Sequence, residues 1–148
     1  MRFSVSNSSQ KKRISIFIYH YNYNRIMILS TFTQSIQVSK DQTAIYLGSG
    51  TLPVFGTPAL VAFMENTAMK LLSDLPAEST SVGISMNMQH MKASRVGASI
   101  ECTATITAIE GRKYTFALKA IDAYSDLIGE GIHERVVVNI DKFMSKIV

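Results

Sequence analysis

One long amphipathic helix constrains this sequence more than any other feature. From Pro58 to Leu75 the apolar residues recur at spacings of three and four, which places them on one face of a helix; they are Leu60, Val61, Phe63, Met64, Ala68, Leu71, Leu72 and Leu75. Thr57 can cap the free amides at the start, Pro58 suits the first helical position, and Pro76 forces the end. A helix of about 18 residues is roughly 27 Å long, enough to lie across four or five strands.

The residues on either side of this helix predict a sheet. After it the apolar period changes to two, and Val82, Ile84, Met86 and Met88 alternate with polar residues or glycine, as in a half-buried strand. Similar runs cover residues 98–109, 113–123 and 127–140, and shorter ones cover residues 35–39 and 43–47. Because the later connections are short, these neighbours should be antiparallel. We therefore expect an α+β domain in which one long helix lies across a mostly antiparallel sheet.

A single helix covers one face of such a sheet incompletely. We therefore expect a homodimer, in which the partner completes the core or extends the sheet. Whether dimers pair further into a dimer of dimers stays open at this point.

The positive charge of the chain is concentrated at one end. The 148 residues have a formal net charge of +4. Residues 1–26 contain five basic side chains and no acidic one, which leaves 10 basic against 11 acidic side chains in the remainder. Because the remainder has no basic surface by composition, we expect no nucleic-acid partner.

Residues 1–26 also differ from the rest of the chain in composition. We expect them to form an extension that is disordered or lies upstream of the functional start. One domain should then cover residues 27–148. The apolar run from Ile14 to Tyr19 ends at His20, too early for a signal peptide or a membrane span, so we expect no membrane partner.

The only cysteine, Cys102, allows no intrachain disulfide and is interpreted as a small core residue. We expect a cytoplasmic protein.

Three residues could carry chemistry. Glu65 has no Lys or Arg three or four residues away on the helix, so its carboxylate is either partly desolvated and suited to proton transfer or simply reaches solvent. Thr57 would lie beside free amides that favour an oxyanion, or would act only as a cap. His90 shares the parity of Met86 and Met88 and should point inward, as a catalyst or as a hydrogen-bonded core residue.

Two further residues could contact a ligand. Gly83, on the opposite parity, removes a side chain from a strand interior, which often marks close approach of a ligand or backbone. Arg135 could pair with a ligand phosphate or with a surface carboxylate. His20, His90 and His133 show no metal-ligand spacing, and the sequence contains neither G-x-S-x-G nor a Walker motif. We therefore expect no metal site, no serine hydrolase and no nucleoside triphosphatase.

Three segments in this order resemble the fluoroacetyl-CoA thioesterase-like family of hot-dog-fold acyl-CoA thioesterases: LPVFGTPALVAFMENTA, SVGISMNMQH and GEGIHERVVV. The resemblance covers roughly residues 35–146. It implies a hot-dog fold and a catalytic set of Thr57, Glu65 and His90 at a dimer interface. It also implies substrate contacts at Gly83 and Phe55 and a contact on the CoA side at Arg135.

The activity implied by this resemblance is hydrolysis of an acyl-CoA to the free acid and CoA, without a cofactor. Glu65 and Thr57 would act at the carbonyl while His90 handles protons, with attack by water or by an acyl-enzyme nucleophile left open. Residues 48–51 lack the phenylalanines that form the lid of the fluoroacetyl specialist, although Phe55 remains, so a generic short or medium acyl group is expected. The alternatives are an acyl-CoA-binding protein without turnover and a hydratase or dehydratase on the same fold.

Overall fold

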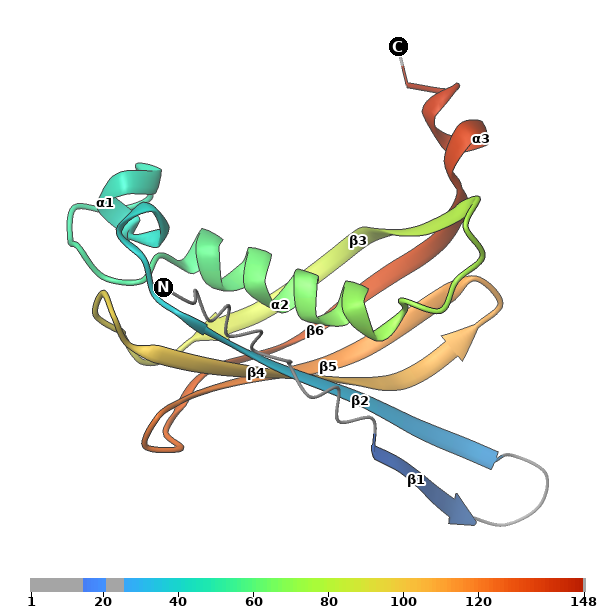
Figure 1. Ribbon diagram of the computed structural model, residues 1–148, viewed down its shortest axis with the longest axis horizontal. Coiled ribbons are helices and arrows are strands. Elements are labelled where there is room, and N and C mark those ends of the chain that lie inside the picture. Colours follow the sequence, from blue (N-terminus) through green and yellow to red (C-terminus); the bar gives the residue numbers. More distant parts are fainter. Residues whose placement is uncertain (1–14, 21–25, 148) are drawn as a thin grey trace, which may run out of the picture.

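The computed structural model describes residues 15–20 and 26–147. Within them a six-stranded antiparallel sheet, in the order β1-β2-β4-β5-β6-β3, wraps one long helix, α2 (Figure 1). The strands are β1 (Ser15–His20), β2 (Ile26–Gln37), β3 (Ser79–His90), β4 (Ser99–Glu110), β5 (Lys113–Asp122) and β6 (Leu127–Asn139). The helices are α1 (Ala44–Leu47), α2 (Thr57–Leu71) and α3 (Ile140–Met144), with a 3-10 turn, η1, at Lys40–Gln42.

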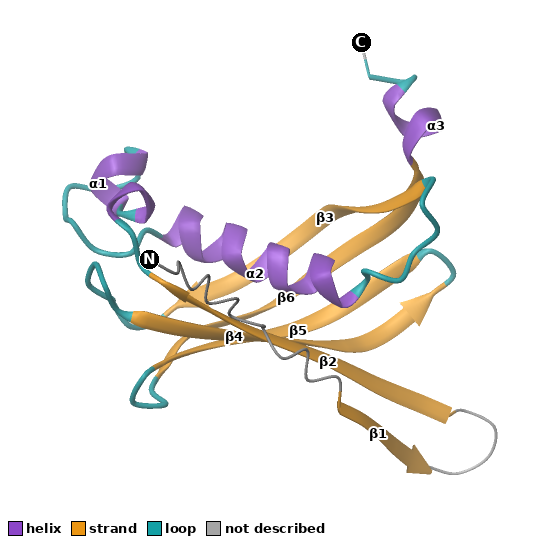
Figure 2. Ribbon diagram, viewed as in Figure 1, coloured by secondary structure: helices purple, strands orange, loops and turns teal. Residues whose placement is uncertain are grey.

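The predicted α+β architecture is confirmed. Figure 2 shows α2 against one face of the sheet, with α1 and α3 toward opposite ends of the molecule. The predicted runs at residues 98–109, 113–123 and 127–140 correspond to β4, β5 and β6, whose ends differ by one residue at most. The short run at residues 35–39 is the end of the longer strand β2.

The predicted strand at residues 43–47 is wrong, because this segment forms helix α1. The Thr43 hydroxyl caps the helix by accepting a hydrogen bond from the Tyr46 amide at 3.4 Å. Gly48 ends it in the left-handed conformation with φ 70°, which glycine adopts without a steric penalty. Five residues of apparent alternation were too few to separate a strand from one capped turn of helix.

The ends of α2 also differ from the prediction. Gly56 occupies the N-cap position without a side-chain hydrogen bond, so capping by Thr57 is wrong and Thr57 is the first helical residue. The helix ends at Leu71, ahead of Leu75 and Pro76, because the Leu72 amide bonds to the Met69 carbonyl at 3.0 Å and so tightens the last turn. Thr57 is thereby free to direct its hydroxyl elsewhere.

The core lies between α2 and the sheet. Leu60, Met64 and Ala68 lie four residues apart on α2 and are fully buried. They pack with sheet residues that include Ile100, Cys102, Ala104, Phe116, Leu118, Ala120 and Ile128. Cys102 is a buried free thiol whose pKa burial raises to about 11, which agrees with its predicted place in the core.

A buried polar cluster fixes the rotation of α2 over the sheet. The Gln34 amide on β2 donates to Asn66 Oδ1 at 3.0 Å and to Thr67 Oγ1 at 2.9 Å. Its carbonyl oxygen accepts from Lys70 Nζ at 2.7 Å. Because three residues of α2 meet one glutamine on this side, the opposite flank of the helix, which carries Glu65, faces β3 and β6.

A β-bulge in β3 determines which of its side chains face α2. Gly83 pairs with Arg135 and Ser85 pairs with Glu134, so Ile84 is left without a partner in the ladder and is 54% exposed. The extra residue reverses the alternation, so that Gly83 shares a face with Met86, Met88 and His90. The predicted uninterrupted alternation, with Gly83 on the parity opposite His90, is therefore wrong.

The sheet ends in two different edges. β1 forms one edge and pairs with β2, while the 12-residue strand β3 forms the other and pairs with β6. The outer edge of β3 has no partner strand among the described residues. A long unpaired edge of this kind can pair with another chain.

The extension proposed for residues 1–26 includes residues 1–14 and 21–25, which lie outside the described residues. Because β1 pairs with β2 alone, a chain that begins at Met27 should keep the helix and the remaining sheet. We expect its far-ultraviolet circular dichroism per residue to stay similar and its thermal unfolding to remain cooperative. Loss of cooperative unfolding in the shortened chain would show that residues 1–26 belong to the folded domain.

Candidate functional site

The first half of the site lies where α2 begins. Thr57 Oγ1 and His90 Nδ1 are 3.0 Å apart, a hydrogen bond that joins the first residue of α2 to the last residue of β3. The ring of Phe55 meets the His90 ring edge-on, with centroids 6.3 Å apart. The structure therefore brings together three of the predicted site residues, Thr57, His90 and Phe55.

The electrostatic setting of His90 favours a neutral imidazole. Burial lowers the pKa of His90, and a contact with the backbone of Lys92 opposes this shift in part. Its Nε2 atom is buried and has no hydrogen-bond partner within the described residues. A neutral histidine that shares a hydrogen bond with a hydroxyl can accept the hydroxyl proton.

Glu65 lies apart from this pair. Eight residues of helix separate it from Thr57, a rise of about 12 Å. Its Oε1 atom is instead 4.0 Å from Nε2 of His133, and the side chain is 41% exposed. Within one chain, the structure therefore does not bring Glu65 together with Thr57 and His90.

Gly83 provides the space that Glu65 occupies. A Cβ atom at Gly83 would lie 3.1 Å from Glu65 Oε1 and 3.0 Å from His133 Cε1, closer than nine in ten real Cβ contacts. The absence of a side chain in this strand, noticed in the sequence, thus allows a carboxylate and an imidazole to approach the backbone of β3.

Arg135 is buried behind Glu65 and is only 7% exposed. It donates from Nε to Ser81 Oγ at 2.9 Å, from Nη2 to the Ser81 carbonyl at 2.7 Å, and from Nη1 to His133 Nε2 at 3.1 Å. His133 Nδ1 lies 2.7 Å from the Ser85 carbonyl, so it carries the ring proton and leaves Nε2 to accept from Arg135. Its hydrogen-bond partners within the chain are therefore Ser81 and His133.

Burial also controls the charges of this second half. It lowers the pKa of His133, and the Arg135 cation lowers that pKa further. It lowers the pKa of Arg135 as well, while the Glu65 charge raises it. The cluster therefore combines a neutral histidine, a buried cation and a half-exposed carboxylate.

Sequence reasoning missed the part played by His133, which is fully buried. The available signal was its spacing of two from Arg135 and from Gly131, which places all three on one face of β6. That pattern marks a face but does not say that the face is the buried one, because charged residues also alternate on solvent-facing strands.

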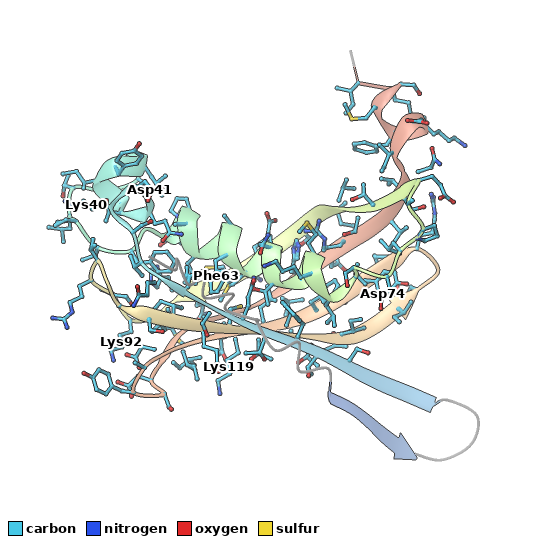
Figure 3. All side chains as sticks on the ribbon, viewed as in Figure 1. Lys40, Asp41, Phe63, Asp74, Lys92 and Lys119 are labelled. Carbon is cyan, nitrogen blue, oxygen red and sulfur yellow. The ribbon has the colours of Figure 1, made fainter. Side chains whose placement is uncertain are left out.

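Two cavities flank the start of α2. One of ≈ 270 Å³ lies beside the Thr57–His90 pair and is lined by residues that include Ala44, Ser49, Val54, Phe55, Met91 and Ala93. The other, of ≈ 400 Å³, is lined by residues that include Asp41 and Phe63, both labelled in Figure 3. The first cavity joins a mainly apolar lining to a hydroxyl and an imidazole, as a small-molecule site requires.

Among residues 15–20 and 26–147, no group of three or more His, Cys, Asp or Glu side chains could hold a metal ion. No helix in the same part of the chain has both the length and the apolar character needed to cross a membrane.

Comparison with known proteins identifies relatives with the same fold. Residues 38–141 match the family described as fluoroacetyl-CoA-specific thioesterase. The fluoroacetyl-CoA thioesterase of Streptantibioticus cattleyicolor is 32% identical over 96 residues, which cover 64% of this chain and 68% of that protein. A crystal structure of a variant of the fluoroacetyl-CoA-specific thioesterase FlK, in complex with fluoroacetate and CoA, is 28% identical with a TM-score of 0.72, covering 76% of this chain and 95% of that one. A hot-dog-like protein from Thermanaerovibrio acidaminovorans is 25% identical with a TM-score of 0.72, covering 78% and 86%. The hot-dog fold is thereby confirmed.

The two histidines whose pKa values are lowered by burial predict how stability depends on pH. Both pKa values lie below 6.5 in the folded chain, so the unfolded chain takes up protons first and the free energy of unfolding should fall as the pH drops below that value. Replacing His133 with Gln should make this fall shallower between about pH 7 and pH 5. Urea unfolding across this range measures the slope. Phe116→Leu, which loosens packing beside the same ring without removing a titrating group, should keep the parental slope.

Proposed function

This chain belongs to the fluoroacetyl-CoA-specific thioesterase family, and we propose that it hydrolyses the thioester bond of a short or medium acyl-CoA to give the free acid and CoA. The observation that carries the proposal is the 3.0 Å hydrogen bond between Thr57 and His90 at the start of α2, beside a mainly apolar cavity. The crystal structure of an FlK variant with fluoroacetate and CoA supports an acyl-CoA as the ligand class.

We propose that the active site is completed in a homodimer through the free edge of β3. Glu65 lies over Gly83 in the first half of that strand, whereas Thr57 and His90 meet at its last residue. In an antiparallel pair of strands, residues directly opposite one another share a face. A two-fold axis through β3 would therefore bring the Gly83 end of one chain to the His90 end of the other.

The bulge determines the register of this pairing. With Ile84 outside the ladder, Gly83 and His90 are each three ladder positions from Asn87. A two-fold axis at Asn87 pairs this residue with its own copy and sets Gly83 opposite His90 of the partner subunit. Glu65 of one chain then approaches the Thr57–His90 pair of the other, and a two-chain site contains all three predicted catalytic residues.

In the proposed reaction, neutral His90 accepts a proton from the attacking group. That group is either the Thr57 hydroxyl, which would form an acyl-enzyme later hydrolysed by water, or a water molecule. The carbonyl oxygen gains negative charge near the free amides at the start of α2, while Glu65 accepts a hydrogen bond from the water or from the protonated imidazole. His90 then returns its proton to the sulfur as the carbon–sulfur bond breaks.

The substrate contacts follow from the same cavity. Phe55 lines it beside His90, and Gly83 leaves space beside Glu65. Small residues at Ala44, Ser49 and Ala93 favour an acyl group of several carbons over a tightly enclosed two-carbon group. For Arg135, the bonds to Ser81 and His133 favour a role behind Glu65 over a contact with CoA.

The proposed enzyme uses no cofactor, since CoA is part of its substrate. We propose a cytoplasmic location, which is compatible with the free thiol of Cys102. A dimer of dimers needs a second interface, and the exposed Ile84 and Ile132 are apolar side chains that could contribute to one.

Replacing Glu65 with Gln should lower kcat for thiol release by about 10² to 10⁴, because an amide can neither accept a proton nor carry negative charge. Thr57→Ala and His90→Gln should lower it as well. Release of free CoA is measured across acyl-CoAs of increasing chain length, with Glu130→Gln, an exposed glutamate on β6, as the matched control. Full activity of the Glu65→Gln protein would favour ligand binding without turnover, and a change in double-bond absorbance without CoA release would favour a hydratase.

The dimer register predicts a disulfide cross-link. In the proposed register Asn87→Cys places two thiols directly opposite each other, within the separation of about 7 Å between Cα atoms that a disulfide tolerates. The control Gln89→Cys lies on the same exposed edge, but its two copies are four ladder positions apart, about 14 Å. Mild oxidation should therefore cross-link the first variant and leave the second monomeric on non-reducing gels. The reverse pattern would show a different register, and the buried Cys102 should not react.

A further inference from the structure

The buried cation beside the site does not pair with the carboxylate nearest to it. Arg135 is 7% exposed and forms no ion pair with a carboxylate among residues 15–20 and 26–147. Its Nη1 atom lies 3.1 Å from Nε2 of His133, and Glu65 Oε1 lies 4.0 Å from the same nitrogen. The cation and the carboxylate thus both lie against one imidazole without forming an ion pair.

The ring of His133 is held in place by three contacts. Nδ1 donates to the Ser85 carbonyl at 2.7 Å, and the side chain has no exposed surface. The Phe116 ring packs beside it, with centroids 6.3 Å apart. On a third side Cε1 lies so close to the backbone that a Cβ atom at Gly83 would be 3.0 Å away. Because Nδ1 carries the ring proton, Nε2 is fixed as a hydrogen-bond acceptor.

The guanidinium of Arg135 is fixed as firmly as the ring. Nε donates to Ser81 Oγ at 2.9 Å and Nη2 donates to the Ser81 carbonyl at 2.7 Å. The remaining nitrogen, Nη1, donates to His133 Nε2. All three nitrogens of the cation therefore have acceptors inside the chain, and the histidine is the acceptor on the side where Glu65 lies.

Glu65 keeps both of its oxygens free of such bonds. Neither oxygen accepts a hydrogen bond within the part of the chain that the structure describes, and the side chain is 41% exposed. A carboxylate beside an arginine commonly forms a bidentate pair, which would occupy both oxygens. Burial lowers the pKa of Arg135 and the charge of Glu65 raises it, so the two charges act on each other without a direct bond.

We propose that His133 is a positioning residue for Glu65: by accepting the hydrogen bond of Arg135, it keeps the guanidinium off the carboxylate and leaves both oxygens available for the reaction. The cation then balances charge from a fixed distance, and the carboxylate can reach toward His90 of the partner subunit. The inference rests on the proposed function for the chemistry of Glu65, but the separation of Arg135 from Glu65 can be observed without turnover.

The alternative is that His133 only fills space in the core, and two substitutions of similar size separate these roles. His133→Gln keeps a carbonyl that can accept from Arg135 and an amide that can donate to Ser85. His133→Leu fills a similar volume without any polar atom. Since a buried donor without an acceptor is costly, Arg135 should then turn to the nearest carboxylate, which is Glu65.

Release of CoA is measured with the full chain carrying each substitution, and urea unfolding gives the folded fraction. We expect His133→Leu to lower kcat by about tenfold or more, with KM within about twofold, because its carboxylate is tied up by Arg135. His133→Gln should keep most of the parental kcat. Phe116→Leu, which loosens packing beside the same ring and leaves its hydrogen bonds intact, should match the parent.

His133→Asn keeps the measurement possible should the leucine variant fail to fold. Its shorter amide can still donate to the Ser85 carbonyl but does not extend far enough to accept from Arg135. We expect it to lose activity as His133→Leu does.

Crystal structures of the parent and the variants give the second readout. In His133→Leu and His133→Asn, an Arg135 nitrogen should lie within about 3 Å of a Glu65 oxygen, the usual separation of a charged hydrogen bond. In the parent and in His133→Gln the two side chains should stay apart. A side chain that only fills space would leave Arg135 and Glu65 unpaired in every variant.

Parental kcat in folded His133→Leu or His133→Asn would overturn the positioning role. Equal losses in His133→Leu and His133→Gln would do the same, because the acceptor would then not be the cause. Failure of the proposed function gives a different result: Glu65→Gln would release CoA as fast as the parent, while the crystal structures would still show whether Arg135 pairs with Glu65 once the acceptor is gone.

Discussion

The bulge at Ile84 is the constraint on which the arrangement of this site depends. Before it, Ser81 and Gly83 face α2, and after it Met86, Met88 and His90 do so. One strand therefore offers a gap for a carboxylate in its first half and an imidazole at its last residue, on the same side of the sheet. In a regular strand, seven residues apart means opposite faces, and either Gly83 or His90 would point away from the helix.

The two ends of β3 differ in charge as well as in composition. At one end Arg135 is a buried cation, which is costly unless it is paired and hydrogen-bonded, and Ser81, His133 and the nearby Glu65 meet that requirement. At the other end Thr57 and His90 form a neutral pair. An acyl transfer needs both a proton acceptor and groups that balance charge, so neither half is sufficient alone. Pairing of two copies through β3 would supply both halves twice.

Much of the fold and part of the site could be predicted from the sequence. The periods of 3.6 and two residues located α2 and the long strands, and the ordered motifs around Thr57, Glu65 and His90 led to the family that the comparisons bear out. The ends of α2, the helix α1 in place of a strand and the buried cluster around His133 were missed or misplaced. The first two depend on single hydrogen bonds of caps and turns, which a pattern of apolar spacing does not resolve, and the third depends on contacts between β3 and β6.

The sequence by itself determined the period of each element, the single core and the residue types available for chemistry, because side-chain direction along a helix or strand follows from backbone geometry alone. Only the tertiary structure decided that Gly83 and His90 share a face, that Glu65 lies beside His133 rather than Thr57, and that Lys92 forms an ion pair with Asp122. The first follows from one unpaired residue in the ladder, and the other two join residues 68 and 30 positions apart, so all three follow from register and packing rather than from any local pattern.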